Sequence, residues 1–188
     1  MINKYKIILA SNSPRRRELL AGLDVEFEIK VIKGISESYP EDLPTEKIAE
    51  YIACEKTDTY AVKGNELLIT ADTIVVVGDS ILGKPHNAEE AHAMLSMLSG
   101  KTHKVITGVC LKTAEKQKAF SVTTEVTFKQ LETSEIDYYI EKYKPYDKAG
   151  SYGIQEWIGY VGVTEIRGSY YNVMGLPVQR IYEEIRKL

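Results

Sequence analysis

The amino-acid sequence predicts an α/β protein built on a mixed, twisted sheet. Strand-like and helix-like segments alternate along the 188 residues, without internal repeats or low-complexity tracts. The run LLITADTIVVV at residues 67 to 77 is too apolar and too rich in β-branched residues to be anything but a buried strand. A chain of this length can bury most of its apolar surface in one compact unit. We therefore expect a single domain over residues 1 to 188.

The other elements follow from hydrophobic periodicity and from turn and cap residues. Ser13 is a suitable N-cap, and Pro14 suits the first position of a helix. Asn87 followed by Glu90 resembles a capping box. The expected strands cover residues 7–10, 25–32 (half-buried), 67–77, 80–82, 102–113 and 117–130, with short strands in the glycine-rich stretch near the end. The expected helices cover residues 14–22, 45–62, 88–99, 134–143 and 177–187.

Composition excludes several classes of protein. The formal net charge is −3, from 24 Lys and Arg against 27 Asp and Glu, so bulk attraction to nucleic acid is not expected. The two cysteines, Cys54 and Cys110, lie in unrelated segments without metal-ligand spacing, which argues against structural zinc and for a reducing compartment. No apolar run has the length of a signal peptide or a membrane span. We expect a cytoplasmic protein with no membrane and no nucleic-acid partner.

Several common catalytic signatures are absent. The chain has neither GxxxxGK[ST] nor GxSxG, so it is not a P-loop enzyme or a typical serine hydrolase. The three histidines, His86, His92 and His103, show no metal-ligand spacing, and we interpret them as surface or loop residues. Catalysis by this chain must then rest on other residues.

Asp72 gives the sharpest chemical signal. A carboxylate within an apolar strand costs several kcal/mol unless a positive or hydrogen-bonding group meets it. Capping a turn or pairing with a structural lysine would satisfy it equally well. However, the strand turns back into Gly83-Lys84-Pro85, where Lys84 stands between two residues that shape the backbone. This arrangement favours a functional role for both charges.

Glu37 and Lys56 could reach the same site from a loop and a helix. Each taken singly is more often a solvated charge. Together, two carboxylates such as Glu37 and Asp72 can hold Mg²⁺ or Mn²⁺, completed by water and phosphate, while lysines neutralise the remaining phosphate charge. The set suits hydrolysis of a phosphoanhydride.

The chain resembles the Maf family of nucleoside triphosphate pyrophosphatases over nearly its whole length. The resemblance is carried, in order, by LASNSPRRRELL at 9–20, ITADTIVVV at 69–77, ILGKPHNAEEA at 81–91, DKAGSYGIQ at 147–155 and GSYYNVMGLPV at 168–178. It implies a two-lobed fold similar to the inosine triphosphatase-like enzymes, with a cleft between the lobes. It also implies hydrolysis of a nucleoside triphosphate to the monophosphate and pyrophosphate. The last two blocks resemble the branch that acts on dTTP and UTP.

The resemblance also implies roles for individual residues. Asp72 would accept the proton of the attacking water, and substrate choice would depend on Arg15, Thr73 and Gln155. Phosphate and metal would be bound by Ser11, Arg16, Glu37, Lys56 and Lys84. The chain departs from the family pattern at two places. The stretch GISES at 34–38 lacks an acidic residue directly before Glu37-Ser38. Glu156 and Trp157 follow Gln155, where the family usually continues with glycine.

The helix that begins at Pro14 gives a reason for its arginines. Unpaired N–H groups and the positive end of the helix dipole attract anions, and Arg15 and Arg16 would strengthen that attraction for a triphosphate. One helical turn cannot direct three consecutive side chains at one ligand, so Arg17 is expected to face solvent. A solvated basic turn is the alternative reading.

Two other function classes remain open at this point. The family has an association with septum formation, so the chain could be a nucleotide-sensing regulatory binder with little turnover. A nucleic-acid-binding module is disfavoured by the acidic balance of charge. The sequence also leaves a homodimer open.

Overall fold

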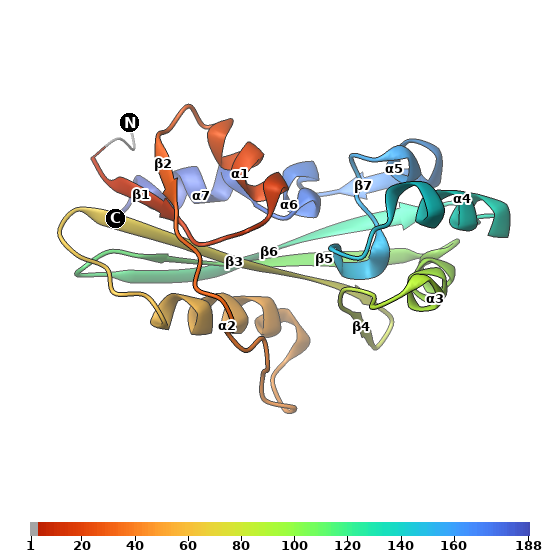
Figure 1. Ribbon diagram of the computed structural model, residues 1–188, viewed down its shortest axis with the longest axis horizontal. Helices are drawn as coiled ribbons and strands as arrows, with labels where there is room; N and C mark the ends of the chain where they lie inside the picture. The colour runs from red at the N-terminus through yellow and green to blue at the C-terminus, as the bar shows by residue number, and fades with distance from the viewer. Residues whose placement is uncertain (1–3) are drawn as a thin grey trace. The chain divides into compact units, whose positions relative to one another are not determined.

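The computed structural model describes residues 4–188 and has the expected α/β architecture (Figure 1). In this part of the chain a seven-stranded mixed sheet has the order β2-β1-β3-β5-β6-β7, and β4 pairs with β3. The strands are β1 (Lys6–Leu9), β2 (Phe27–Ile29), β3 (Glu66–Val77), β4 (Ser80–Leu82), β5 (Thr102–Lys112), β6 (Gln117–Phe128) and β7 (Val163–Arg167). The helices are α1 (Pro14–Ala21), α2 (Thr45–Asp58), α3 (Ala88–Leu98), α4 (Thr133–Tyr143), the 3₁₀ turn η1 (Ala149–Ser151), α5 (Trp157–Gly162), α6 (Tyr170–Met174) and α7 (Val178–Ile185).

The chain divides into two compact units. The first consists of the chain up to Thr73 with Thr107–Val122 and Gly175–Leu188, and the second consists of Ile74–Ile106 with Thr123–Met174. Strands β3, β5 and β6 each contribute residues to both units. The expected cleft between lobes stays a prediction.

In the first unit, parallel strands carry the helices. Strand β1 pairs in parallel with β2 and with β3. Figure 1 shows α2 on one face of these strands and α1 and α7 on the other. Helices α1 and α2 are the crossovers that connect the parallel strands β1, β2 and β3. One face of β3 therefore meets α2, a feature on which the candidate site depends.

The second unit has its own apolar core. Strand β3 turns back into β4 with Val75 opposite Leu82, as the Gly78-Asp79 turn predicts. The core is closed by α3, which packs against α4 and η1. Its largest fully buried side chains are Tyr139, Phe128, Leu95 and Leu98. Within residues 4–188, no helix is long and apolar enough to cross a membrane.

Helix caps and hairpins are placed as the sequence predicts. The Ser13 hydroxyl accepts a hydrogen bond from the Arg16 backbone N–H at 3.4 Å, and Asn87 Oδ1 accepts from the Glu90 N–H at 2.8 Å. The second half of the Asn87 capping box is absent, because the Glu90 carboxylate accepts instead from the backbone N–H of His86. The β5–β6 hairpin reverses near Glu115 and Lys116.

Other expected elements are shorter or different. The strand expected over residues 25–32 is limited to β2, because its neighbour β1 offers only Lys6–Leu9 for pairing. The helix expected over residues 45–62 ends at Asp58, because Tyr60 turns into the core and its hydroxyl accepts the Ile32 N–H at 2.8 Å. The glycine-rich stretch contains η1, α5, β7 and α6, where only short strands were expected.

His103 is not a surface residue. It lies on β5 with 1% of its surface exposed, and its Nε2 shares a 2.6 Å hydrogen bond with the Tyr152 hydroxyl. The ring also packs against Phe128. The pattern of β5 alone does not distinguish a buried histidine from an exposed one. His86 is exposed in the segment before α3, and His92 is half-buried on α3, so both lie at the surface as predicted.

Burial of His103 predicts a pH-dependent stability. Burial lowers the pKa of His103 from 6.5 to about 4, so the unfolded chain binds a proton more readily between these values. The contribution to the free energy of unfolding is complete above about pH 6.5 and declines as the pH falls toward 4, by about 3 kcal/mol in total. Urea unfolding across this range measures the slope. In His103→Gln the slope should flatten, whereas the matched variant His92→Gln should keep it; equal slopes in all three proteins would contradict the assignment.

Candidate active site

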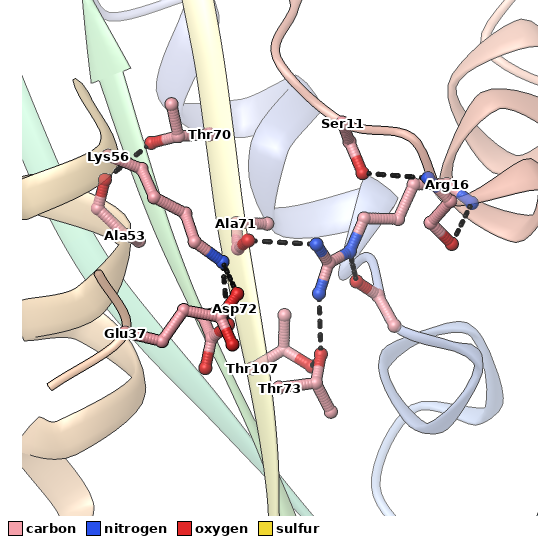
Figure 2. Close-up of polar contacts among 12 residues, drawn as sticks. Ser11, Arg16, Glu37, Ala53, Lys56, Thr70, Ala71, Asp72, Thr73 and Thr107 are labelled. Carbon is pink, nitrogen blue, oxygen red and sulfur yellow. Dashed lines mark hydrogen bonds and ion pairs between the residues drawn. The ribbon is translucent and has the colours of Figure 1, made fainter. Parts of the chain in front are cut away.

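Three charged side chains predicted from the sequence meet beside β3 (Figure 2). Asp72 is 9% exposed on this strand, and its Oδ1 accepts a 2.8 Å hydrogen bond from Lys56 Nζ in the last turn of α2. The same ammonium group lies 2.7 Å from Oε1 of Glu37, in the loop between β2 and α2. The Lys56 and Asp72 side chains are only 15% and 13% exposed, whereas Glu37 is 50% exposed. The result is a largely buried cation held between two carboxylates.

Buried hydroxyl groups fix the position of α2 over β3. Thr70 Oγ1 on β3 donates to the Ala53 carbonyl of α2 at 2.7 Å and lies 2.5 Å from Thr57 Oγ1 on the same helix. Thr70 and Asp72 lie two residues apart and so point to the same face of β3. The helix that carries Lys56 is thus bonded to the strand that carries Asp72. Neither threonine could be predicted from the sequence, because a hydroxyl in a helix or strand carries no signal of its partner.

Arg16 lies on the opposite side of β3 from Lys56, as Figure 2 shows. Its Nη1 donates to the Ala71 carbonyl at 2.8 Å, its Nη2 to Thr73 Oγ1 at 3.1 Å and its Nε to the Gly175 carbonyl at 2.8 Å. Burial lowers the pKa of Arg16, although the carboxylates of Asp72 and Glu37 act in the opposite direction. The guanidinium therefore bonds the chain on either side of Asp72.

The Ser11–Arg17 segment comprises the loop before α1 and the first turn of that helix. Ser11 is buried, and its hydroxyl accepts the Ser13 N–H at 3.2 Å. Arg15 is half-buried. Arg17 is also half-buried, where sequence analysis expected it to face solvent; its Nη2 donates to the Asn12 carbonyl at 3.3 Å. Binding of a nucleotide by Ser11, Arg15, Arg16 or Thr73 stays a prediction.

The two remaining predicted residues, Lys84 and Gln155, belong to the second unit. Lys84 is exposed just after β4. Gln155 is half-buried, and its Oε1 is fully buried without a hydrogen-bond partner among the described residues. The amide therefore has one acceptor whose hydrogen-bonding capacity no described residue uses.

Glu156, which departs from the family pattern, has partners of its own. Its Oε1 lies 3.2 Å from Nζ of the buried Lys148, and its Oε2 accepts from the Tyr139 hydroxyl. The Tyr139 hydroxyl in turn accepts the Gly153 N–H at 3.0 Å. Lys148 and Tyr139 were not among the predicted residues, although Lys148 stands in the DKAGSYGIQ block that carries the resemblance.

Comparison with known proteins decides the family. The family model described as Maf-like protein matches residues 6–188. The chain belongs to the Maf family. A protein of Phocaeicola vulgatus named dTTP/UTP pyrophosphatase is 61% identical, over 100% of this chain and 98% of that protein. Proteins of the same name are 58% identical in Parabacteroides distasonis, over 98% of this chain and 97% of that protein, and 49% identical in Flavobacterium johnsoniae, over 100% and 97%.

The donor set of this Maf protein can be compared with what a divalent cation requires. Glu37 and Asp72 direct carboxylate oxygens at one ammonium group, at 2.7 and 2.8 Å. Mg²⁺ is commonly held by one or two carboxylates together with water and substrate phosphates. Among residues 4–188, no group of three or more His, Cys, Asp and Glu side chains could hold a metal ion. Two carboxylates are within the number that Mg²⁺ takes from a protein, so Glu37 and Asp72 would fit such a cation only with water and substrate as its other ligands.

The three hydrogen bonds of Arg16 predict a structural cost of replacing it. Arg16→Lys keeps a positive charge but cannot donate in three directions from a planar group. Because one charge-assisted hydrogen bond contributes about 1.5–3 kcal/mol, the free energy of unfolding should fall by about 2 kcal/mol or more. Urea unfolding measures the change. Arg17→Lys is the matched control and should cost less, since Arg17 makes a single long bond to an exposed carbonyl; an equal cost would contradict the role of Arg16.

Proposed function

We propose that this Maf protein hydrolyses dTTP and UTP to the nucleoside monophosphate and pyrophosphate. The observation that carries the proposal is the buried Asp72 carboxylate, held at 2.8 Å by Lys56 with Glu37 beside it. The names of the full-length relatives support the same activity. A cytoplasmic location and a homodimer stay predictions from the sequence.

Asp72 acts as the proton acceptor in this proposal. One carboxylate oxygen is occupied by Lys56, which fixes the orientation of the group. The carboxylate takes a proton from water as the water oxygen attacks the α-phosphorus. The bond between that phosphorus and the bridging oxygen then breaks, and pyrophosphate leaves. Proton transfer to a positioned base contributes about 10²- to 10⁴-fold to a rate.

Positive groups would compensate the charge of the triphosphate. Lys56 and Lys84 neutralise phosphate oxygens, and Ser11, Arg15 and Arg16 belong to the same binding set. Glu37 and Asp72 would hold Mg²⁺ or Mn²⁺, which when bound supplies further neutralisation of the phosphates. The three donors of Arg16 that contact the protein give this residue a second task, the positioning of β3 around Asp72.

Gln155 is proposed to recognise the base. Uracil and thymine present an N3–H donor beside carbonyl acceptors, which a planar amide complements. The buried, unpartnered Oε1 of Gln155 supports this assignment, because a buried acceptor without a donor costs about 1–3 kcal/mol. Thr73 and Arg15 are assigned to substrate choice with it.

A panel of nucleotides tests the function. Pyrophosphate release should be fastest from UTP and dTTP, by about tenfold or more over CTP, ATP and GTP, because a site that hydrogen-bonds one base leaves polar groups unpaired with another. Release should stop when a chelator removes Mg²⁺ and Mn²⁺. Faster release from a purine triphosphate would contradict the base assignment. Tight nucleotide binding without release would contradict the enzyme and favour a regulatory binder.

The role of Asp72 predicts the effect of a nearly isosteric change. Asp72→Asn keeps the shape of the side chain but cannot accept the proton, so kcat should fall about 10²- to 10⁴-fold while UTP still binds. Steady-state kinetics and titration with UTP under non-turnover conditions measure the two quantities. Asp79→Asn, in the exposed turn after β3, is the control. Near-normal turnover of Asp72→Asn would remove the assignment.

Replacing Gln155 should alter preference more than rate. In Gln155→Ala the ratio of kcat/KM for UTP over CTP should fall about tenfold, with a smaller change in kcat for UTP, because recognition of the base is lost while the phosphate chemistry remains. Gln117→Ala on β6 is the matched control. An equal loss for every nucleotide would show that Gln155 does not select the base.

A further inference from the structure

The two cysteines, which are far apart in the sequence, lie on elements that pack together in the first unit. Cys54 is on α2 and is half-buried, and Cys110 is on β5 and has no exposed surface. Neither belongs to the charged site described above. Their surroundings define what the pair can do.

Two contacts show which residues of α2 lie beside which residues of β5. At one end, a Cβ on Gly108 would lie 2.1 Å from the Ala49 carbonyl carbon, so helix and strand backbones are in direct contact there. At the other end, Lys112 Nζ lies 3.2 Å from Asp58 Oδ1. From Gly108 to Cys110 a strand advances about 6.6 Å. Along α2, the four residues from Glu50, which follows Ala49, to Cys54 advance a similar distance of about 6 Å. Cys54 and Cys110 therefore lie at a similar distance from the Gly108 contact.

Neighbouring contacts agree with this register. Thr70 Oγ1 donates to the carbonyl of Ala53, the neighbour of Cys54, at 2.7 Å, and it lies 3.5 Å from the carbonyl of Cys110 itself. Each thiol also acts on the pKa of the other, which is lowered for Cys110 and raised for Cys54. The register of α2 on β5 and this mutual effect both indicate that the two thiols are neighbours.

We propose that Cys54 and Cys110 form a reversible oxidation site, which closes into an intramolecular disulfide when the protein meets a peroxide. The partly exposed Cys54 reacts first: its sulfur takes one oxygen from hydrogen peroxide, giving a sulfenic acid and one water. The sulfur of Cys110 then attacks the Cys54 sulfur. The S–S bond forms, the S–O bond breaks, and the hydroxyl group leaves as a second water with the thiol proton of Cys110. The two thiols lose two electrons, and the peroxide gains them.

The environment assigns different tasks to the two sulfurs. Cys110 is too deeply buried to meet an oxidant directly, but its lowered pKa suits the attack on a neighbouring sulfur. The raised pKa of Cys54 keeps its thiol protonated, so this first step is slow. The closed bond would tether the turn of α2 that precedes Lys56.

Mass spectrometry of the full-length protein tests the proposal. The protein is treated with hydrogen peroxide at mildly alkaline pH, unfolded, alkylated with a maleimide and digested. We expect both cysteines to escape alkylation, a cross-linked peptide pair containing Cys54 and Cys110, a protein that remains free of intermolecular disulfides, and full recovery of both thiols with dithiothreitol. Oxidation of Cys54 to sulfinic acid while Cys110 stays alkylatable would overturn the proposal, as would disulfides between chains.

Two variants separate the roles of the thiols. In Cys110→Ala, which avoids placing a polar group in the core, Cys54 should no longer be protected and should proceed to irreversible sulfinic acid. In Cys54→Ser, Cys110 should resist the same peroxide treatment. Rapid oxidation of Cys110 in Cys54→Ser would contradict the order of the two steps. None of these measurements depends on nucleotide hydrolysis, so the result is independent of the proposed function.

Discussion

Burial of the Asp72 carboxylate in β3 is the constraint to which the first unit is adapted. An ionised carboxylate removed from water is tolerated only when a cation or hydrogen-bond donors replace the water. Lys56 provides that cation at 2.8 Å, but only because α2 lies flat on the strand. The helix is held there by the contacts of Thr70 Oγ1 with Thr57 Oγ1 and the Ala53 carbonyl, and it lies close because Gly108 has no side chain. The geometry of the charged site therefore rests on small, uncharged residues.

The alternation of side chains along β3 divides the site into two faces. Asp72 points toward α2, whereas Thr73 points the other way and meets Arg16. Since Arg16 also bonds the Ala71 carbonyl, one guanidinium holds the strand on both sides of the residue that faces Lys56. Its bond to Gly175 joins the segment before α7 to the same point. A single arginine thus links three stretches of chain that are remote in sequence.

Local signals predicted those parts of the fold that local interactions determine. The Ser13 cap, strand β3 and the turn into β4 depend on neighbouring residues, and the sequence indicates each correctly. The length of β2 depends on β1, and the burial of His103 depends on Phe128 and Tyr152, so neither could be read from its own segment. The same holds for the site. Sequence motifs grouped Glu37, Lys56 and Asp72, whereas the protein partners of Arg16 and the contact of the two cysteines arise only when distant segments pack.

The position of the thiol pair on α2 connects it to the charged site through the stiffness of the helix. At Gly108 the backbone of β5 already touches that of α2, so the first half of the helix cannot move closer to the strand. The Lys112–Asp58 ion pair at the other end is partly exposed. It can be broken at little cost in free energy, because such pairs contribute little to stability. Any displacement caused by closing the Cys54–Cys110 bond must therefore be taken up in the second half of α2. Lys56 lies in that half, and the orientation of Asp72 depends on it.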